Sequence, residues 1–407
     1  MLKPIIIVII SSVIWACSNK PRIETNLPEE LYQDTINVSI HCGAELIDNY
    51  INMVKNKNIA IVANQTSQVN NVHLLDTLLA HNINVIKVFC PEHGFRGDAD
   101  AGALIDDSKD LKTGIPIVSL YGNNKKPKKN QIEGIDIILF DLQDVGVRFY
   151  TYISTLHYVM EACAENNIKL IVLDRPNPNG YYVDGPVLDT AYKSFIGMHP
   201  VPIVHGMTIG EYATMINGEK WLSDSLECDL YVVKCKGWLH SMPYNLPVKP
   251  SPNLPNYRSV QLYPSICLLE GTAISIGRGT DKQFQLIGHP YYKNWAAATY
   301  SFTPNSNVGA QNPKLKGKLC YGFDLSDSCY HFKCDTNRLN IDFVMECYKQ
   351  FPDKNDFFKS SFNLLSGGKT LKMQIIDNMD ENKIRETWEP QLSNFKKIRK
   401  KYLLYDE

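Results

Sequence analysis

The sequence predicts an α/β fold in which a Rossmann-like parallel sheet domain is followed by a second, mixed α+β auxiliary domain. Short apolar runs rich in β-branched residues recur roughly every 20 to 30 residues in the first half of the chain, a spacing typical of βαβ units. Several of these runs end abruptly in polar residues. Because parallel sheets bind ligands outside the carboxyl ends of their strands, we expect one rim of the sheet to carry the functional site.

Four expected strands carry these polar clusters. They lie at residues 59–63, 83–89, 135–140 and 168–173, and a further strand is expected at 116–122. The candidate site residues that follow the four strands are, in order, Asn64; Glu92 and His93; Asp141, Gln143 and Asp144; and Asp174, Arg175 and Asn177.

Between the strands lie amphipathic stretches at 69–82 and 151–166, which we interpret as helices. Ser67 or Asn71 could cap the start of the first helix. We place the first domain at about residues 36–190. It contains neither G-x-G-x-x-G nor G-x-x-x-x-G-K-[ST], so the sequence does not support a dinucleotide or nucleotide cofactor.

The composition of the sequence changes after Gly185-Pro186: prolines become frequent, and the connections between expected elements become longer. Here we place the auxiliary domain, at residues 191–407. Its expected elements are strands at 230–235 and 318–326, a loop at 303–318, and helices at 343–351 and 388–405, the last with a basic face.

The first seventeen residues indicate a lipoprotein signal peptide. Lys3 precedes an apolar stretch that is too short to span a bilayer and has the length of a signal-peptide core. The segment Ile14-Trp15-Ala16-Cys17 resembles a bacterial lipobox, in which Cys17 becomes lipidated; the alternative is an ordinary cleaved signal. Residues 18–35 have the composition of a tether. We therefore expect a lipid-anchored protein of the cell envelope, on the periplasmic side of the outer membrane.

Composition excludes some partners and ligands. Lys and Arg number 42 against 43 Asp and Glu, so no positive field favours nucleic acid. The cysteines after Cys17 form no C-x-x-C pair and fit no zinc template, so no cysteine-ligated zinc site is expected. Cys90, Cys163 and Cys267 lie in apolar contexts and are interpreted as buried thiols.

Glu92 and His93 belong to the densest polar cluster, C-P-E-H-G-F-R-G. The glycine that follows, Gly94, favours a tight turn where the backbone approaches a ligand closely. A carboxyl group in this position could act as a general acid. The alternative is a turn carboxylate that accepts hydrogen bonds from nearby amides.

The segment after the third strand combines groups that suit sugar recognition. Asp141 and Asp144 are followed by Arg148 and Tyr150, and aromatic faces pack against the C–H side of sugar rings while carboxylates bind hydroxyls. The alternative for Asp144 is a helix N-cap. We interpret Tyr152 as part of the core.

Two further segments contain candidates. Arg175 could bind a carboxylate bidentately or pair with Asp174 as a structural bridge. Thr208 and Glu211 fit a capping box, which leaves His205 freer to take part in function.

In the second domain, Glu270 ends an apolar run, and Arg278 stands in a G-R-G turn suited to an anion. Because one short loop joins these two residues, they could face the first domain across a cleft.

The motifs taken together resemble one family, the exo-β-N-acetylmuramidases of the NamZ type. The motifs are P-E-H-G-x-R-G, D-x-Q-D-x-G-x-R-x-Y-T-Y, D-R-P-N-P, H-G-M-T-x-G-E, C-L-L-E-G-T-x-x-S-x-G-R-G-T and a closing Y-L-L-Y, and they cover about residues 40 to 405. The resemblance implies a glycoside hydrolase that removes terminal N-acetylmuramic acid from the non-reducing ends of peptidoglycan fragments. It also implies that Glu92 is catalytic, that Arg148, Arg175 or Arg278 binds the lactyl carboxylate, and that no metal or organic cofactor is needed.

The second catalytic group stays open at this point. Asp141, Asp144, Glu270 and His205 compete for the role, and the 2-acetamido group of the substrate could replace a protein nucleophile. Two other functions are also compatible with these residues: a non-catalytic muropeptide-binding envelope lipoprotein, and a metal-dependent phosphoesterase built from Glu92, His93, Asp141 and Asp144.

Overall fold

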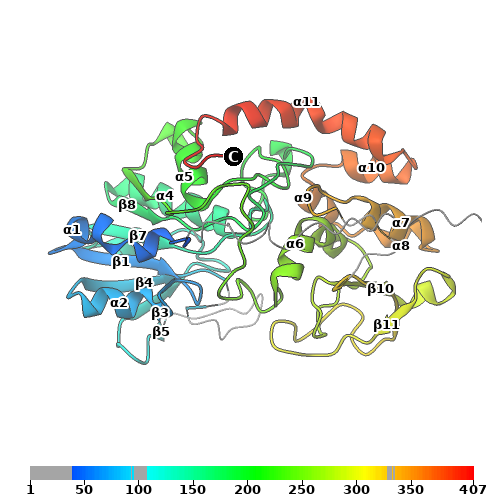
Figure 1. The fold of residues 1–407 in the computed structure, drawn as a ribbon, viewed down its shortest axis with the longest axis horizontal. Helices are drawn as coiled ribbons and strands as arrows, with labels where there is room; N and C mark the ends of the chain where they lie inside the picture. The colour runs from blue at the N-terminus through cyan, green and yellow to red at the C-terminus, as the bar shows by residue number, and fades with distance from the viewer. Residues whose placement is uncertain (1–38, 93, 96–107, 328–331, 333–334) are drawn as a thin grey trace, which may run out of the picture. The chain divides into compact units, whose positions relative to one another are not determined.

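The structure, a computed structural model, describes residues 39–92, 94–95, 108–327, 332 and 335–407 (Figure 1). The predicted signal peptide, the lipidation site Cys17, the tether and the candidate His93 lie outside these residues.

A seven-stranded sheet forms the centre of the first domain, in the order β5-β6-β4-β1-β7-β8-β9. All neighbouring strands pair in parallel except the short edge strand β5, which confirms the α/β prediction. The strands are β1 (Asn58–Ala63), β4 (Asn84–Cys90), β5 (Ser108–Lys109), β6 (Pro116–Ser119), β7 (Ile137–Asp141), β8 (Lys169–Leu173) and β9 (Leu230–Val233).

Both faces of this sheet are buried. Alternate residues of a strand point to opposite faces, so Ile59 and Ile61 belong to one apolar cluster while Ala60 and Val62 belong to the other. The first cluster includes residues of α1 and α2, and the second includes residues of α3, α4 and α5. The bounds of these helices are α1 (Ile51–Val54), α2 (Leu74–Ala80), α3 (Lys129–Ile132), α4 (Tyr152–Asn166) and α5 (Ile209–Gly218).

Helix α2 begins later than its predicted start at residue 69. A small hairpin of β2 (Gln68–Val69) and β3 (Val72–His73) precedes it, because Asn70 and Asn71 adopt φ values of 48° and 67° and make a two-residue turn. The cap is His73, whose ring nitrogen accepts from the amide of Leu75. The predicted caps Ser67 and Asn71 were therefore wrong.

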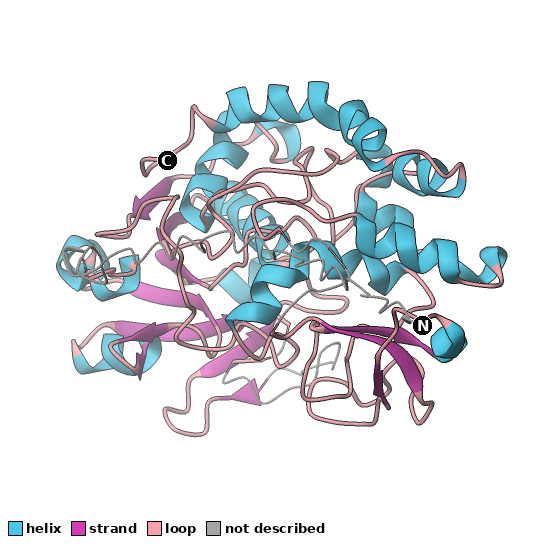
Figure 2. Cartoon of the chain, turned by 45° about the vertical axis from the view of Figure 1, so that its right-hand side comes forward, coloured by secondary structure: helices cyan, strands magenta, loops and turns pink. Residues whose placement is uncertain are grey.

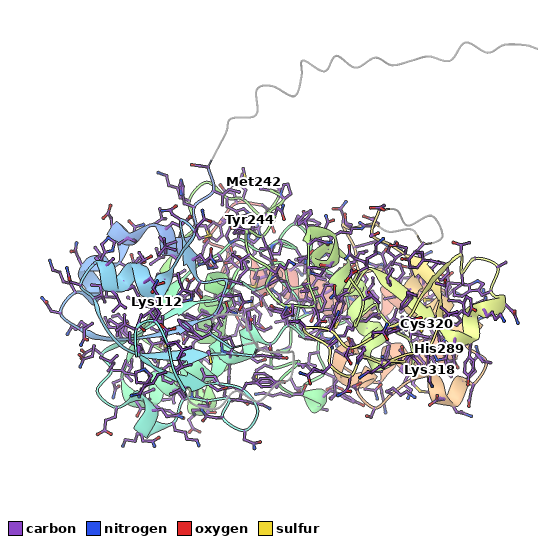
Figure 3. The ribbon with its side chains drawn as sticks, turned by 90° about the horizontal axis from the view of Figure 1, so that it is seen from below. Lys112, Met242, Tyr244, His289, Lys318 and Cys320 are labelled. Atoms are coloured by element: carbon purple, nitrogen blue, oxygen red, sulfur yellow. The ribbon has the colours of Figure 1, made fainter. Side chains whose placement is uncertain are left out.

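The second domain is built on a three-stranded antiparallel sheet in the order β10-β12-β11. Figure 2 shows its strands as a group separate from the large sheet. Its elements are α6 (Tyr257–Ile266), β10 (Leu286–His289), β11 (Tyr300–Phe302), β12 (Cys320–Asp324), α7 (Asp342–Gln350), α8 (Lys354–Phe357), α9 (Phe362–Ser366), α10 (Thr370–Ile376) and α11 (Glu381–Arg399). His289, Lys318 and Cys320 lie together at this sheet (Figure 3), where burial and then the charge of Lys318 lower the pKa of His289 to about 4.

The large sheet continues past residue 190, at which we placed the domain boundary. Strand β9 pairs with β8, and α5 packs on the same sheet, because the apolar run at 230–233 completes its edge. The expected loop at 303–318 contains only the short bridge between Asn307 and Ala310.

The predicted final helix was displaced: α11 ends at Arg399, and the residues after it return to the first domain near α5 (Figure 1). There the amide of Leu404 donates to Glu211 at 2.8 Å, and the hydroxyl of Tyr405 donates to Asp174 at 2.6 Å. The Y-L-L-Y motif therefore joins the end of α11 to the first domain.

No helix among the described residues is both long enough and apolar enough to cross a membrane. Cys163 and Cys267 are buried thiols, and Cys90 is buried as well, as the sequence predicted.

Candidate active site

The carboxyl ends of the central strands lie side by side at one edge of the sheet. Val62 pairs with Phe89, Ala63 with Asp141, and Phe140 with Val172. The polar clusters that follow these strands therefore gather at one rim, as predicted.

A pocket of about 130 Å³ opens at this rim. Both halves of the chain line it, and four of the predicted site residues are among them: Glu92, Tyr150, Glu270 and Arg278. The other lining residues are Phe149, Thr151, Tyr152, Ser251, Asn253, Leu254, Tyr263, Cys267 and Phe284. We call this the Glu92 pocket.

Glu92 enters the pocket from the turn that follows β4. The amide of Gly94 donates to the carbonyl of Pro91 at 3.3 Å, and Gly94 adopts a φ of 78°, a conformation that favours glycine. Burial, followed by the negative charge of Glu92, raises the pKa of Tyr121. The predicted tight turn is confirmed, and it presents a carboxyl group to the pocket.

Tyrosine rings form one wall of the pocket. Tyr150 meets Tyr152 edge to face at 4.8 Å between centroids, and Tyr263 at 6.0 Å. The Tyr150 hydroxyl donates to the carbonyl of Pro250 at 2.9 Å, and the amide of Asn64 donates to the hydroxyl of Tyr152 at 2.7 Å. Burial raises the pKa of Tyr150 and Tyr152, so both rings stay neutral at ordinary pH. Asn64 thus positions a pocket residue without lining the pocket.

Glu270 and Arg278 form an ion pair at 3.3 Å on the opposite side of the domain boundary from Glu92. Arg278 stands between Gly277 and Gly279, whose φ values are 80° and 81°. A Cβ at Gly277 would lie 2.6 Å from the carbonyl oxygen of Lys282, so only glycine fits this turn. The guanidinium Nε of Arg278 has no hydrogen-bond partner among the described residues, nor has the buried amide oxygen of Asn253. The Arg278 Nε–H can therefore donate a hydrogen bond to a ligand, and the Asn253 amide oxygen can accept one from it.

Asp141 and Arg175 do not line the pocket. They pair with each other bidentately, at 2.5 Å and 2.9 Å, and both are buried. The predicted catalytic role of Asp141 and the predicted substrate contact of Arg175 give way to a structural ion pair, although the partner expected for Arg175 was Asp174. No group of three or more His, Cys, Asp and Glu side chains among the described residues could hold a metal ion.

Asp174 anchors the start of α5. It accepts from the amides of Arg175 and Gly210 and from the hydroxyls of Thr208 and Tyr405, at 2.6 to 3.0 Å. Burial raises its pKa to about 6, although these donors favour the charged form. The predicted capping box of Thr208 and Glu211 is confirmed.

The side chains of Gln143 and Asn177 bind backbone carbonyls at the rim and do not line the pocket. Gln143 donates to the carbonyl of Pro176 at 2.8 Å, and Asn177 donates to that of Met207 at 2.9 Å. Both side chains are buried and absent from the pocket lining.

Asp144 and His205 form a second buried pair outside the pocket. Asp144 Oδ2 and His205 Nε2 are 3.8 Å apart, and Asp144 Oδ1 and His205 Nε2 have no hydrogen-bond partner among the described residues. Burial raises the pKa of Asp144 to about 7 and lowers that of His205 to about 3. The two groups are therefore both largely neutral near pH 6.

Arg148 links the two domains. Its guanidinium donates to the carbonyls of Pro186 and Val201 at 2.8 and 2.9 Å and to that of Leu365 at 3.0 Å. Burial lowers its pKa to about 9. The predicted substrate contact of Arg148 is replaced by a contact with the protein's own backbone.

Several residues of the site had no signal in the sequence. Ser251 and Asn253 come from a proline-rich connection, and Tyr263 comes from α6, which was not predicted. Lys314, in the loop before β12, donates to the backbone of the turn that carries Glu270. Only the folded chain brings these segments to the rim.

Comparison with known proteins supports a single assignment. Models of the N-terminal and C-terminal parts of exo-β-N-acetylmuramidase NamZ match residues 59–258 and 261–405. The chain is 38% identical over 95% of its length to the peptidoglycan β-N-acetylmuramidase NamZ of Bacillus subtilis, of which it covers 92%.

Two crystal structures of DUF1343 family proteins from Bacteroides fragilis share the fold. One superposes with a TM-score of 0.83 at 46% identity and the other with 0.78 at 30%; each match covers 91% of this chain and at least 99% of the other. The chain belongs to the exo-β-N-acetylmuramidase NamZ family.

Proposed function

We propose that this protein is a peptidoglycan glycosidase that releases terminal N-acetylmuramic acid from the non-reducing ends of peptidoglycan fragments, with Glu92 as general acid. The observation that carries the proposal is the Glu92 pocket itself. Within it a carboxyl group from the first domain, an ion pair from the second and a tyrosine wall line one small space. The name of the relative from Bacillus subtilis, a peptidoglycan β-N-acetylmuramidase, supports the same reaction.

The chemistry of glycoside hydrolysis assigns roles to these groups. Cleavage requires a proton for the leaving oxygen and stabilisation of an oxocarbenium-like centre. Glu92 supplies the proton. Glu270 is the best placed of the four candidates for the second role, because it lines the pocket and Asp141, Asp144 and His205 do not. Arg278 binds the lactyl carboxylate through the guanidinium edge that Glu270 leaves free.

The test of this proposal is the turnover of a chromogenic N-acetylmuramide. Glu92→Gln keeps the shape of the side chain and removes its proton, so we expect turnover to fall by about 10² to 10⁴-fold. The free energy of unfolding should change by less than about 1 kcal/mol. Glu133→Gln, at the exposed end of α3, is the matched control and should keep full activity.

Three outcomes would contradict the proposal. Near-normal turnover by Glu92→Gln would remove Glu92 from the acid role, and a preference for the corresponding glucosaminide would overturn the substrate. If the wild type bound muramyl ligands without turning them over, the protein would instead be a muropeptide-binding lipoprotein.

We also propose that Cys17 carries a lipid anchor that holds the enzyme in the cell envelope, on the periplasmic side of the outer membrane. The basis is the sequence Ile14-Trp15-Ala16-Cys17 after a short apolar core. Metabolic labelling with a radioactive fatty acid should mark the wild type and leave Cys17→Ser unlabelled. Labelling of both proteins would refute the anchor.

A further inference from the structure

A second, larger cavity lies away from the Glu92 pocket. Its volume is about 620 Å³, within the range of about 300 to 1,000 Å³ that is usual for ligand sites, and the two cavities share no lining residue. It is bounded by Gly180–Val183, by His240 and Ser241, and by the carboxyl-terminal turns of α11 with Glu407. We call it the α11 cavity.

The α11 cavity is strongly positive. Lys396, Lys397 and Lys400 line it, all three are exposed, and none forms an ion pair with the described residues. The one carboxylate in the lining, Glu407, pairs with Arg399. Three ammonium groups therefore surround one space whose single side-chain carboxylate, that of Glu407, interacts with both Arg399 and Lys400, and this excess of positive charge makes the site suited to an anion.

These lysines are held by a rigid support. Leu392 and Phe395 bury the inner face of α11, and the guanidinium of Arg399 donates to the carbonyl of Gly206 through two nitrogens, at 2.7 and 3.1 Å. Arg399 therefore stabilises the fold, whereas the three lysines form no ion pair with the described residues.

Basic residues in the last turn of a helix also offset its dipole, which is the simplest structural explanation for them. Lys401, just beyond the end of α11, lies outside the cavity and pairs with Glu219 at 3.5 Å. The dipole does not explain why the other lysines share a concave site with two tyrosine rings and two serine hydroxyls.

The uncharged part of the lining suits a saccharide. Tyr181 and Tyr182 lie at 5.1 Å between ring centroids, and the hydroxyl of Tyr181 donates to the carbonyl of Thr336 at 2.9 Å, which fixes that ring. Ser241 and Ser393 add hydroxyls that can exchange hydrogen bonds with sugar hydroxyls. Aromatic faces pack against the apolar side of sugar rings.

We propose that the α11 cavity binds an anionic glycan, a saccharide chain that carries carboxylate or phosphate groups. The lysines bind the acidic groups as point charges, and the tyrosines and serines contact the sugar. Such a site would hold the enzyme on a polymer of the cell wall without taking part in hydrolysis. The proposal does not depend on which residues catalyse the reaction.

The test compares two triple variants that lose the same charge, Lys396→Gln/Lys397→Gln/Lys400→Gln and the control Lys55→Gln/Lys57→Gln/Lys383→Gln, whose lysines are exposed outside the cavity. Both are made in the Glu92→Gln background so that no substrate is consumed. Calorimetry measures binding to four probes: peptide-free peptidoglycan strands, which carry carboxylates; phosphomannan, a saccharide chain that carries phosphates; neutral chitooligosaccharide; and vesicles of phosphatidylglycerol and phosphatidylcholine in equal parts.

We expect the cavity variant to bind at least one anionic polymer about tenfold more weakly at low salt, and the difference to shrink as salt screens the charges. The control should stay within about twofold of the parent, and chitooligosaccharide should bind all three proteins alike. The polymer that responds identifies carboxylate or phosphate as the recognised group. With Glu92 restored, the cavity variant should hydrolyse the small chromogenic muramide at close to the normal rate.

Three results would overturn the proposal: equal weakening by the control variant, no difference for either polymer, or a dependence on the cavity lysines seen only with the vesicles. The last result would assign the site to a lipid surface. Because the cavity variant and the control share the Glu92→Gln background, any remaining turnover affects both alike, so the comparison is independent of whether Glu92 is the general acid.

Discussion

The ammonium group of Lys314 donates a hydrogen bond to the carbonyl oxygen of Thr272 at 2.7 Å, although 42 residues separate them. The same group donates to the carbonyl of Ile274 at 2.9 Å and, more weakly, to those of Leu269 and Glu270 at 3.3 Å. A single cation thus gathers the carbonyls of the turn that carries Glu270. Burial lowers the pKa of Lys314, and the nearby carboxylate of Glu270 opposes that shift.

Lys314→Met should lower kcat, because it changes the position of Glu270, and it should lower the free energy of unfolding only moderately. Removing the cation leaves carbonyls unsatisfied, at a cost of about 1 to 3 kcal/mol in the free energy of unfolding. We expect kcat for the chromogenic muramide to fall by about tenfold or more, because a small misplacement of a reacting group is costly. Lys316→Met, which removes one exposed contact to Gln311, is the control. Equal kcat values for Lys314→Met and the wild type would refute this positioning role.

Asp141→Ala should lower the free energy of unfolding and leave the turnover of the folded enzyme nearly unchanged. The variant leaves the guanidinium of Arg175 buried without its partner, which costs about 3 to 5 kcal/mol. Urea denaturation measures the loss, and turnover well below the melting temperature should stay within about fivefold of normal per folded molecule. If the variant were as stable as the wild type but inactive, Asp141 would return as a catalytic candidate.

Asp144 and His205 should have opposite effects on the pH dependence of stability. Folding raises the pKa of Asp144 from 3.8 to about 7, so its contribution is present below pH 3.8 and is lost as the pH rises to 7. Folding lowers the pKa of His205 from 6.5 to about 3, so its contribution is present above pH 6.5 and is lost as the pH falls to 3. Between about pH 4 and 6.5 the two effects cancel in the wild type.

Single variants should reveal each effect. Relative to the wild type, Asp144→Asn should lose stability as the pH falls from 6.5 to 4, and His205→Gln should gain it, each by at most about 1.4 kcal/mol per pH unit. Urea denaturation across this range measures the difference curves. Curves parallel to the wild type would show that burial does not shift the two pKa values.

Arg278→Gln should weaken recognition of the acidic substituent. The guanidinium is the cation of the Glu92 pocket that we assign to the lactyl carboxylate, and losing a hydrogen bond to a charged group costs about 1.5 to 3 kcal/mol, or roughly 10 to 150-fold in kcat/KM. A glucosaminide, which lacks the carboxylate, should be affected far less. Equal losses on the two substrates would assign Arg278 a role other than carboxylate binding.

The sheet could be predicted because its strands are local, apolar and buried on both faces. The runs at 59–63 and 168–173 match β1 and β8 to within one residue at each end. The start of α2 could not be predicted. Two asparagines in left-handed conformations make a turn where the leucine pattern predicts a helix.

The sequence predicts which residues lie at the rim, but it does not predict which of them line the pocket and which stabilise the fold. Every polar group there is chemically able to contact substrate, and only side-chain packing assigns Asp141 to Arg175 and leaves Glu92 to the pocket. The sequence supports Glu270 and Arg278 by their spacing alone. Asn253 and Lys314 act through contacts with distant segments, so no local pattern marks them.

The hydroxyl of Tyr405 completes the set of donors around Asp174, at the start of α5. This tyrosine lies 231 residues from Asp174 along the chain, so the carboxylate at the end of β8 has all four donors only when the segment after α11 has returned to the first domain. A truncation just before Tyr405 would therefore destabilise the amino-terminal sheet, although it removes none of its residues.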